Sequence, residues 1–180
     1  MEQNITIRNA NRTDISKIMD IERECFDNDT IESESVYIER IDKFNDGFLV
    51  LTNNDTVIGF ICSEIWTQCD NLNENSFKLE HSISETLDLN GKVLYISSLA
   101  ISKQYTGYGY GKTLFNFLIE SVTSKYNNIK EIILLVGSEW KNAHQLYKKE
   151  GFEDVREFVN FFGGGNVSKY NGIIMKKRIK

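Results

Sequence analysis

The chain has 180 residues, of which 41% are hydrophobic and 26% are charged, and its formal net charge is −5. These values are typical of a globular protein with one core, and they predict a single domain over residues 1–180. No stretch approaches the roughly 18 consecutive apolar residues of a membrane span, and the acidic balance disfavours nucleic acid as a partner.

The cysteine and histidine content narrows the kinds of site that are expected. Cys25, Cys62 and Cys69 are odd in number and show no C-x-x-C spacing, which favours reduced thiols and a cytoplasmic protein. The two histidines form no cluster with the cysteines, so no metal site is predicted.

The N-terminal part of the chain is predicted to contain both strands and helices. Thr13 is a good N-cap, and Ile15, Ile18 and Met19 follow it at helical spacing. Asparagine and aspartate at 53–55 tolerate the left-handed backbone of a hairpin turn. The predicted elements are a strand over 5–8, a helix from 13 to about 25, a helix over 33–43 and strands over 48–52 and 57–66.

Residues 67–92 form a polar, acidic insert that is too long for an ordinary hairpin loop. Leu79, Ile83 and Leu87 recur every four residues and predict a short helix inside it. Connections of this length are usually functional lids or disordered segments. The sequence leaves open whether this insert is a lid or a decoration.

The C-terminal part alternates strands and helices, which predicts a mixed sheet with helices on its faces. Gly151 is placed to end a helix. The predicted elements are a strand over 93–101, a helix over 109–125, a strand over 129–136, a helix over 139–150 and strands over 155–162 and 170–177. The apolar face of the first of these helices is predicted to be Leu114, Phe117, Leu118, Ser121 and Val122.

Glycines at 107, 109 and 111 connect the strand over 93–101 to the following helix. A glycine-rich turn that opens a helix is typical of phosphate binding, because the backbone approaches the anion closely and unpaired N–H groups point at it. A dinucleotide fingerprint would need a third glycine at Lys112, and a nucleoside-triphosphate loop would need its first glycine at Thr106. Both of these alternatives are weak matches.

The same stretch resembles the acyl-CoA loop of the GNAT superfamily of N-acetyltransferases, in which a strand leads into [QR]-x-x-G-x-[GA] and a helix that reads G-K-x-L. LAI at 99–101 matches the strand, and GYGKTLFNFLIE at 109–120 matches the helix. LVGSEWKNAHQLYKKEGF at 135–152 resembles the family's second motif, V-x-x-x-N-x-x-A-x-x-L-Y-x-x-x-G-F. The chain departs from the family at Thr106, where Gln or Arg is usual, and at Trp140, where Asn is usual.

This resemblance implies the GNAT fold, an α/β (α+β) arrangement with a mixed, mostly antiparallel central sheet that is splayed at its centre and has helices on both faces. It also implies acetyl-CoA as co-substrate, without a metal. Direct attack by the acceptor amine is expected, because no G-x-S-x-G or other nucleophile motif is present. Family members are often homodimers, so a homodimer is one expectation.

The resemblance also assigns residues to the co-substrate. The pantetheine arm is expected to pair with the strand at Leu99, Ala100 and Ile101, where the N–H of Leu99 or Ala100 faces the thioester oxygen. Tyr147 matches the tyrosine that protonates the leaving sulfur in many family members. The other residues expected to bind the coenzyme are Thr106, Gly107, Tyr108, Gly109, Tyr110, Gly111, Lys112 and Asn142.

The general base is the least defined part of the expected site. The two positions at which family members carry a glutamate are Tyr95 and Leu135 in this chain. Glu64, near the end of its strand and beside the sheet centre, is the first candidate. Glu80 and His81 in the insert are weaker candidates, and a water chain is an alternative.

The leading hypothesis is therefore an acetyl-CoA-dependent N-acetyltransferase that acts on an amine of a small molecule or a protein. The connection between the first two helices carries Asp27, Asp29, Glu32 and Glu34, and together with the acidic insert it favours a cationic acceptor. Two alternatives are a non-catalytic acyl-CoA-binding or regulatory module on the same fold and a nucleoside triphosphatase.

Overall fold

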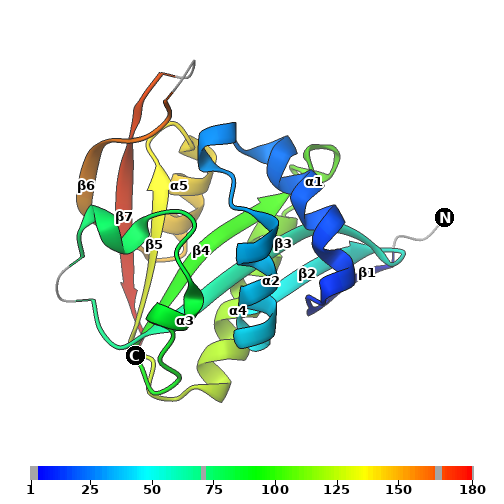
Figure 1. Cartoon of the computed structure of the whole chain (residues 1–180), viewed down its shortest axis with the longest axis horizontal. Coiled ribbons are helices and arrows are strands. Elements are labelled where there is room, and N and C mark those ends of the chain that lie inside the picture. The colour runs from blue at the N-terminus through cyan, green and yellow to red at the C-terminus, as the bar shows by residue number, and fades with distance from the viewer. Residues whose placement is uncertain (1–3, 70–71, 165–167, 180) are drawn as a thin grey trace.

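The computed structural model describes residues 4–69, 72–164 and 168–179. Seven strands form one sheet in the order β1-β2-β3-β4-β5-β7-β6 (Figure 1). Neighbouring strands are antiparallel except β4 and β5, which are parallel. The strands and helices are β1 (Ile5–Asn9), α1 (Ile15–Cys25), α2 (Glu34–Lys43), β2 (Phe48–Asn53), β3 (Thr56–Trp66), α3 (Ile83–Thr86), β4 (Val93–Ile101), α4 (Tyr110–Lys125), β5 (Glu131–Gly137), α5 (Lys141–Lys149), β6 (Glu153–Phe162) and β7 (Tyr170–Arg178).

The predicted order of strands and helices and the mixed, mostly antiparallel sheet are confirmed. The first helix begins two residues later than Thr13, because the side chain of Asn11 accepts the Thr13 N–H at 2.9 Å and caps a 3-10 turn over Arg12–Asp14. Asn54 and Asp55 have φ of 47° and 64°, the left-handed turn that was expected. The helix predicted inside the insert is a single turn, α3.

Helix α4 packs against one face of the sheet. Leu114, Leu118 and Val122 are buried there as predicted, but Phe115 rather than Phe117 completes the apolar face. Phe117 is 46% exposed and Ser121 is also exposed, so the prediction for these two positions is wrong. The buried positions lie at i, i+1, i+4 and i+8 along the helix. The apolar face is therefore rotated about the helix axis, toward Phe115 and away from Phe117.

Helices α1 and α2 cover the opposite face, in front of the sheet in Figure 1. The ring of Tyr37 on α2 lies 5.7 Å from that of Phe48 and 5.6 Å from that of Phe60. The insert continues this layer, because its Phe77 packs against Trp66 and Phe158 at centroid distances of 5.7 and 6.0 Å. Both faces of the sheet are thus covered by helices or by the insert.

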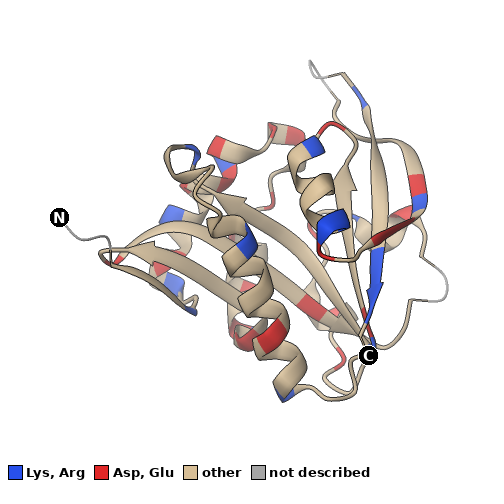
Figure 2. Cartoon of the chain, turned by 180° about the vertical axis from the view of Figure 1, so that it is seen from behind, with Lys and Arg blue, Asp and Glu red and all other residues tan. Residues whose placement is uncertain are grey.

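Charged residues are distributed unevenly over the elements. Charges of both signs lie on α1, α2, α4 and β6, whereas those on α5 and β7 are basic (Figure 2). Strands β2, β3 and β4 contain one charged residue, Glu64. In the part of the chain that the structure describes, no helix has both the length and the apolar character that crossing a membrane requires.

Candidate active site

The sheet opens between β4 and β5. The two strands pair as far as Ile96 and Leu134, and no pair is recorded beyond this point although both strands continue. At the same place β4 has a bulge at Ser97, where its register against β3 shifts between Cys62 and Ser63. A bulge bends its strand and increases its twist, which accounts for the divergence. The splayed sheet centre that the sequence predicts is therefore present.

The open edge of β4 carries backbone groups without a strand partner. Leu99, Ala100 and Ile101 pair with β3 on one side only. Since N–H and C=O groups alternate in direction along a strand, part of them point into the gap. The Ile101 carbonyl accepts a bond of 3.3 Å from the Cys25 thiol. This edge is therefore able to pair with an extended ligand.

The glycine loop leads directly into α4. Gly107 and Gly109 have φ of 84° and 81°, which glycine adopts without strain, and Gly109 is the N-cap of the helix. Beyond the chain neighbours, no atom lies within 4 Å of the position that a Cβ would take at either residue. Among the described residues, no acceptor is recorded for the backbone N–H groups of Gly109, Gly111 and Lys112. An open surface, free N–H groups and the helix dipole together suit an anion such as a pyrophosphate.

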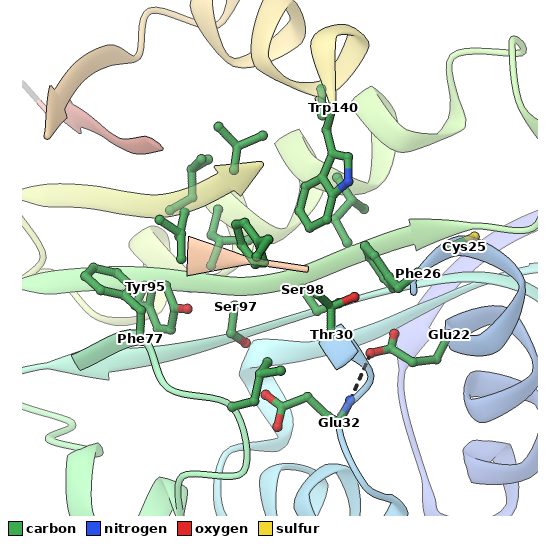
Figure 3. Close-up of a pocket in the computed structure, with 18 of the residues that line it drawn as sticks. Glu22, Cys25, Phe26, Thr30, Glu32, Phe77, Tyr95, Ser97, Ser98 and Trp140 are labelled. Carbon is green, nitrogen blue, oxygen red and sulfur yellow. Dashed lines mark hydrogen bonds between the residues drawn. The ribbon is translucent and has the colours of Figure 1, made fainter. Parts of the chain in front are cut away.

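A cavity of about 210 Å³ lies where β4 and β5 diverge. Its walls come from both strands, α1 and its connection to α2, the insert, α5 and the end of β6. Figure 3 shows Ser97 and Ser98 on β4, with Trp140 on one side of them and Glu22 and Glu32 on the other. The cavity therefore joins the open edge of β4 to side chains that are far apart in the sequence.

Glu22 brings a buried carboxylate into this cavity from α1. Glu22 is 1% exposed. Its Oε1 accepts hydrogen bonds from the Tyr37 hydroxyl at 2.7 Å and from the Glu32 N–H at 3.4 Å. Its Oε2 is buried and has no hydrogen-bond partner among the described residues. Burial, only partly offset by the bond from Tyr37, raises the pKa of Glu22 to about 7. Such a group exchanges a proton readily at neutral pH.

Glu64, the first sequence candidate for a base, lies outside the set of described residues that line the cavity. Its Oε1 is 2.7 Å from Nε2 of His81, and its Oε2 accepts bonds from Trp66 at 2.9 Å and Thr86 at 2.5 Å. Burial raises its pKa, but the bond from His81 and the charge of Arg40 outweigh this and lower the pKa of Glu64 below its ordinary value. Both oxygens are engaged in holding the insert against β3.

The other two candidates, Glu80 and His81, also hold the insert in place: His81 binds Glu64 of β3, and Glu80 binds the connection that precedes α2. Glu80 accepts bonds from the N–H and the hydroxyl of Ser33 at the start of α2, and its own N–H donates to Glu32 at 2.8 Å. Phe77 and Leu79 of the insert line the cavity directly. The insert therefore forms part of the cavity wall.

Tyr147 lines the cavity from α5. Its ring lies 5.1 Å from that of Phe115 and 6.1 Å from that of Phe152, so the side chain is fixed between α4 and the end of α5. Burial raises the pKa of Tyr147 well above its ordinary value, so the hydroxyl remains protonated at neutral pH. A protonated hydroxyl in this position can donate a proton to a ligand in the cavity.

The remaining sequence candidates lie on the glycine loop and on α5. Tyr108 is 67% exposed and its ring stacks on that of Tyr110 at 5.8 Å. Lys112 forms an ion pair of 2.9 Å with Glu150, and the Thr106 hydroxyl donates to the Lys103 carbonyl at 2.8 Å. Asn142 is exposed on the first turn of α5 and is not among the described residues of the cavity wall.

Sequence reasoning missed Glu22 and the aromatic walls. Glu22 lies at i+4 from Ile18 and i+7 from Ile15, inside the apolar stripe of α1, and a carboxylate there is a detectable signal. Trp140 packs against Phe26 at 5.5 Å and Phe162 at 5.0 Å, contacts that join three distant segments. No local pattern indicates those contacts.

Comparisons with known proteins bear on the family and on the fold. A family model described as "Acetyltransferase (GNAT) family" matches residues 15–152. A relative from Sulfurisphaera tokodaii, named N-alpha-acetyltransferase, is 28% identical over 161 residues, which cover 88% of this chain and 86% of the relative. Ard1 from Thermoplasma volcanium has a similar structure, with a TM-score of 0.75 and 17% identity, over 98% of each chain. Arabidopsis thaliana Naa50, solved with the bisubstrate analogue CoA-Ac-MVNAL, has a TM-score of 0.71 and 20% identity, over 96% of this chain and 97% of that chain.

Proposed function

The chain belongs to the acetyltransferase (GNAT) family, and we propose that it transfers the acetyl group of acetyl-CoA to an amine by direct attack. The observation that carries the proposal is the position of the anion-binding loop relative to the open sheet. The 3-10 turn Lys103–Tyr105 and the glycine loop follow the end of β4, so the loop continues from the open edge of that strand. A pyrophosphate on the loop would leave its pantetheine arm directed along Leu99–Ile101 toward the cavity.

The residues present fit this co-substrate. Glycines with positive φ and an open surface admit a pyrophosphate close to the backbone at 107–112. The free edge of β4 offers N–H and C=O groups to the amides of a pantetheine arm. An N–H of Leu99 or Ala100 is the donor that we assign to the thioester oxygen. When bound, acetyl-CoA supplies an activated acyl group with a thiolate leaving group.

The chain's own groups then position the reactants and move protons. Tyr147 keeps its proton because it is buried, and we assign it the transfer of that proton to the departing sulfur. The contacts of Glu64 and His81 hold the insert in place, so that Phe77 and Leu79 shield the cavity from water. In this proposal Glu64 acts as a positioning residue.

Thiol release and calorimetry test the proposal together. We expect CoA to bind the purified protein with one site per chain, Mg–ATP not to bind, and thiol to be released from acetyl-CoA when an amine is supplied. Intersecting initial-rate lines and an unmodified intact mass after incubation with acetyl-CoA would support direct attack. Binding of CoA without turnover of any amine would instead indicate an acyl-CoA-binding module, and binding of Mg–ATP without CoA would indicate a nucleotide site.

A further inference from the structure

Among the described residues that line the cavity, Glu22 has a buried carboxylate oxygen, Oε2, without a hydrogen-bond partner. Leaving a carboxylate oxygen buried and unpaired is unfavourable unless a cation or donor from a ligand completes it. The residue is 1% exposed, and it lies beside Thr30 and Glu32 on the side of the cavity opposite Trp140 (Figure 3). The ammonium group of an acceptor would supply the missing partner.

The other acidic residues near the cavity are already engaged or lie outside its described wall. Glu32 binds Arg40 through Oε1 at 2.8 Å and the Glu80 N–H through Oε2 at 2.8 Å. Asp27, Asp29 and Glu34, which suggested a cationic acceptor in the sequence, are exposed and do not line the cavity among the described residues. In the described wall of the cavity, one carboxylate therefore keeps an unpaired oxygen, which is enough for a single positive charge.

The rest of the wall is mainly aromatic and aliphatic. Besides Tyr147, aromatic side chains reach the cavity from the residue after α1, from α2, the insert and β4, from the residue before α5 and from the end of β6. These side chains are Phe26, Tyr37, Phe77, Tyr95, Trp140, Phe161 and Phe162. Such walls favour an apolar carbon skeleton, and each further ammonium group of a polycation would lose hydration here without gaining an anion.

We propose that Glu22 binds and deprotonates an acceptor that carries one amine on an apolar skeleton, and that polyamines and aminoglycoside-like polycations are poor substrates. This inference rests on the proposed function, since it describes the acceptor half of the same site. The acceptor ammonium gives up two protons in the reaction. Glu22 takes the first on Oε2 and passes it to solvent. As the N–C bond forms and the C–S bond breaks, the thiolate takes the hydroxyl proton of Tyr147, and the second proton leaves nitrogen for solvent, from which Tyr147 regains a proton.

The surroundings of Glu22 suit this role. The titratable and charged groups that face it are Tyr37 and Arg40 of α2, Glu32 of the connecting segment, Cys25 of α1 and Cys62 of β3. Since the pKa of Glu22 is about 7, the carboxylate form predominates above neutral pH and can accept a proton.

An amine panel in the thiol-release assay tests the selectivity. We expect kcat/KM for 2-phenylethylamine and leucinamide to exceed that for spermidine and cadaverine by at least tenfold. A tetrapeptide with an N-terminal leucine also carries one amine beside an apolar side chain. Comparing its kcat/KM with that of leucinamide shows whether the acceptor is a small amine or the N-terminus of a peptide. Preference for spermidine or cadaverine would overturn the inference and leave the proposed function intact, whereas absence of turnover with every amine would overturn both.

Substitution of Glu22 tests its role separately. Glu22→Gln keeps the acceptor for Tyr37 but cannot take up a proton, so we expect kcat/KM to fall about 100-fold and its dependence on pH near 7 to disappear. Glu24→Gln is the matched control, because Glu24 lies on the same helix and accepts the Lys103 N–H at 2.7 Å outside the described cavity wall. Unchanged kcat/KM and pH dependence in Glu22→Gln would overturn its assignment.

Discussion

His81 and Glu64 are joined by a hydrogen bond of 2.7 Å between Nε2 and Oε1, and this bond fastens the insert to β3. The other ring nitrogen of His81, Nδ1, lies 2.9 Å from the Lys78 carbonyl oxygen. Both partners are acceptors when Glu64 is ionised, so the two contacts are satisfied together only when both ring nitrogens carry a proton and His81 is an imidazolium. The insert is therefore held by a charge that depends on pH.

The first prediction concerns this charge. Burial opposes it, but the bond and the charge of Glu64 outweigh burial and raise the pKa of His81 above its ordinary value. The stabilisation is complete below the unfolded pKa of about 6.5 and is lost as pH rises through the higher folded pKa. We expect His81→Gln to lower the free energy of unfolding by about 2 kcal/mol at pH 6 and by less at pH 9.

Urea denaturation at several pH values measures this difference. His144→Gln is the control, because His144 pairs with Asp154 at 2.9 Å on a more exposed surface and should change stability little. A His81→Gln penalty that is the same at pH 6 and pH 9 would contradict the charged pair.

The second prediction is that Glu22 lowers stability. A carboxyl whose folded pKa is raised binds more protons in the folded state, so its contribution to stability falls as pH rises from about 4.5 to about 7 and stays low above. At pH 8, Glu22→Gln should therefore have a free energy of unfolding that is higher than that of the wild type by up to about 3 kcal/mol, measured by urea denaturation. At pH 4.5 the two proteins should differ little. A variant less stable than the wild type at pH 8 would show that the carboxylate is structural.

The third prediction concerns the glycine loop. Gly109→Ala places a Cβ in the open space above the loop and should raise KM for acetyl-CoA about tenfold, with kcat little changed. Gly151→Ala is the matched control, because its φ of 88° imposes similar strain at a position outside the loop. Steady-state kinetics give KM for acetyl-CoA in both variants. An equal rise of KM in both would contradict a specific role of the loop and would indicate that backbone strain at either position weakens binding.

The fourth prediction concerns Tyr147. Tyr147→Phe keeps the ring contacts with Phe115 and Phe152 and removes the hydroxyl, so we expect kcat to fall about 100-fold with little change in the affinity for CoA. Tyr126→Phe removes a hydroxyl that binds Asp46 at 2.7 Å away from the described cavity wall, and it should leave kcat unchanged. An unchanged kcat in Tyr147→Phe would remove this residue as the acid.

Local patterns were sufficient for most of the fold. Spacing of apolar residues, Gly151 as a helix stop and the turn at Asn54 and Asp55 are properties of short segments, and the structure contains each of them. The predicted apolar face included Phe117 instead of Phe115, because these two phenylalanines lie on opposite sides of Leu118 around the helix axis and gave two nearly equal faces. The sequence did not decide between them.

The acceptor side of the site was less predictable, because it depends on contacts between distant segments. Nothing near Glu64 in the sequence indicates that His81 and Thr86 bind its carboxylate oxygens. Likewise, nothing near Glu22 indicates that Arg40 pairs with Glu32 rather than with Glu22. The bulge at Ser97, which opens the sheet, is a property of pairing with β3 rather than of the segment itself. A carboxylate within the apolar stripe of α1 was the one local sign of the acceptor site.

A crystal structure of the protein with CoA bound tests the central claim most directly. We predict that the pyrophosphate lies on the backbone N–H groups of the loop at 107–112 and that the pantetheine arm follows the free edge of β4. The thiol should enter the cavity between Ser98 and Val136, on the side that contains Glu22 and Tyr147. CoA bound elsewhere, for example in the hollow beside Trp66 and Leu72, with the gap between β4 and β5 empty, would contradict the account.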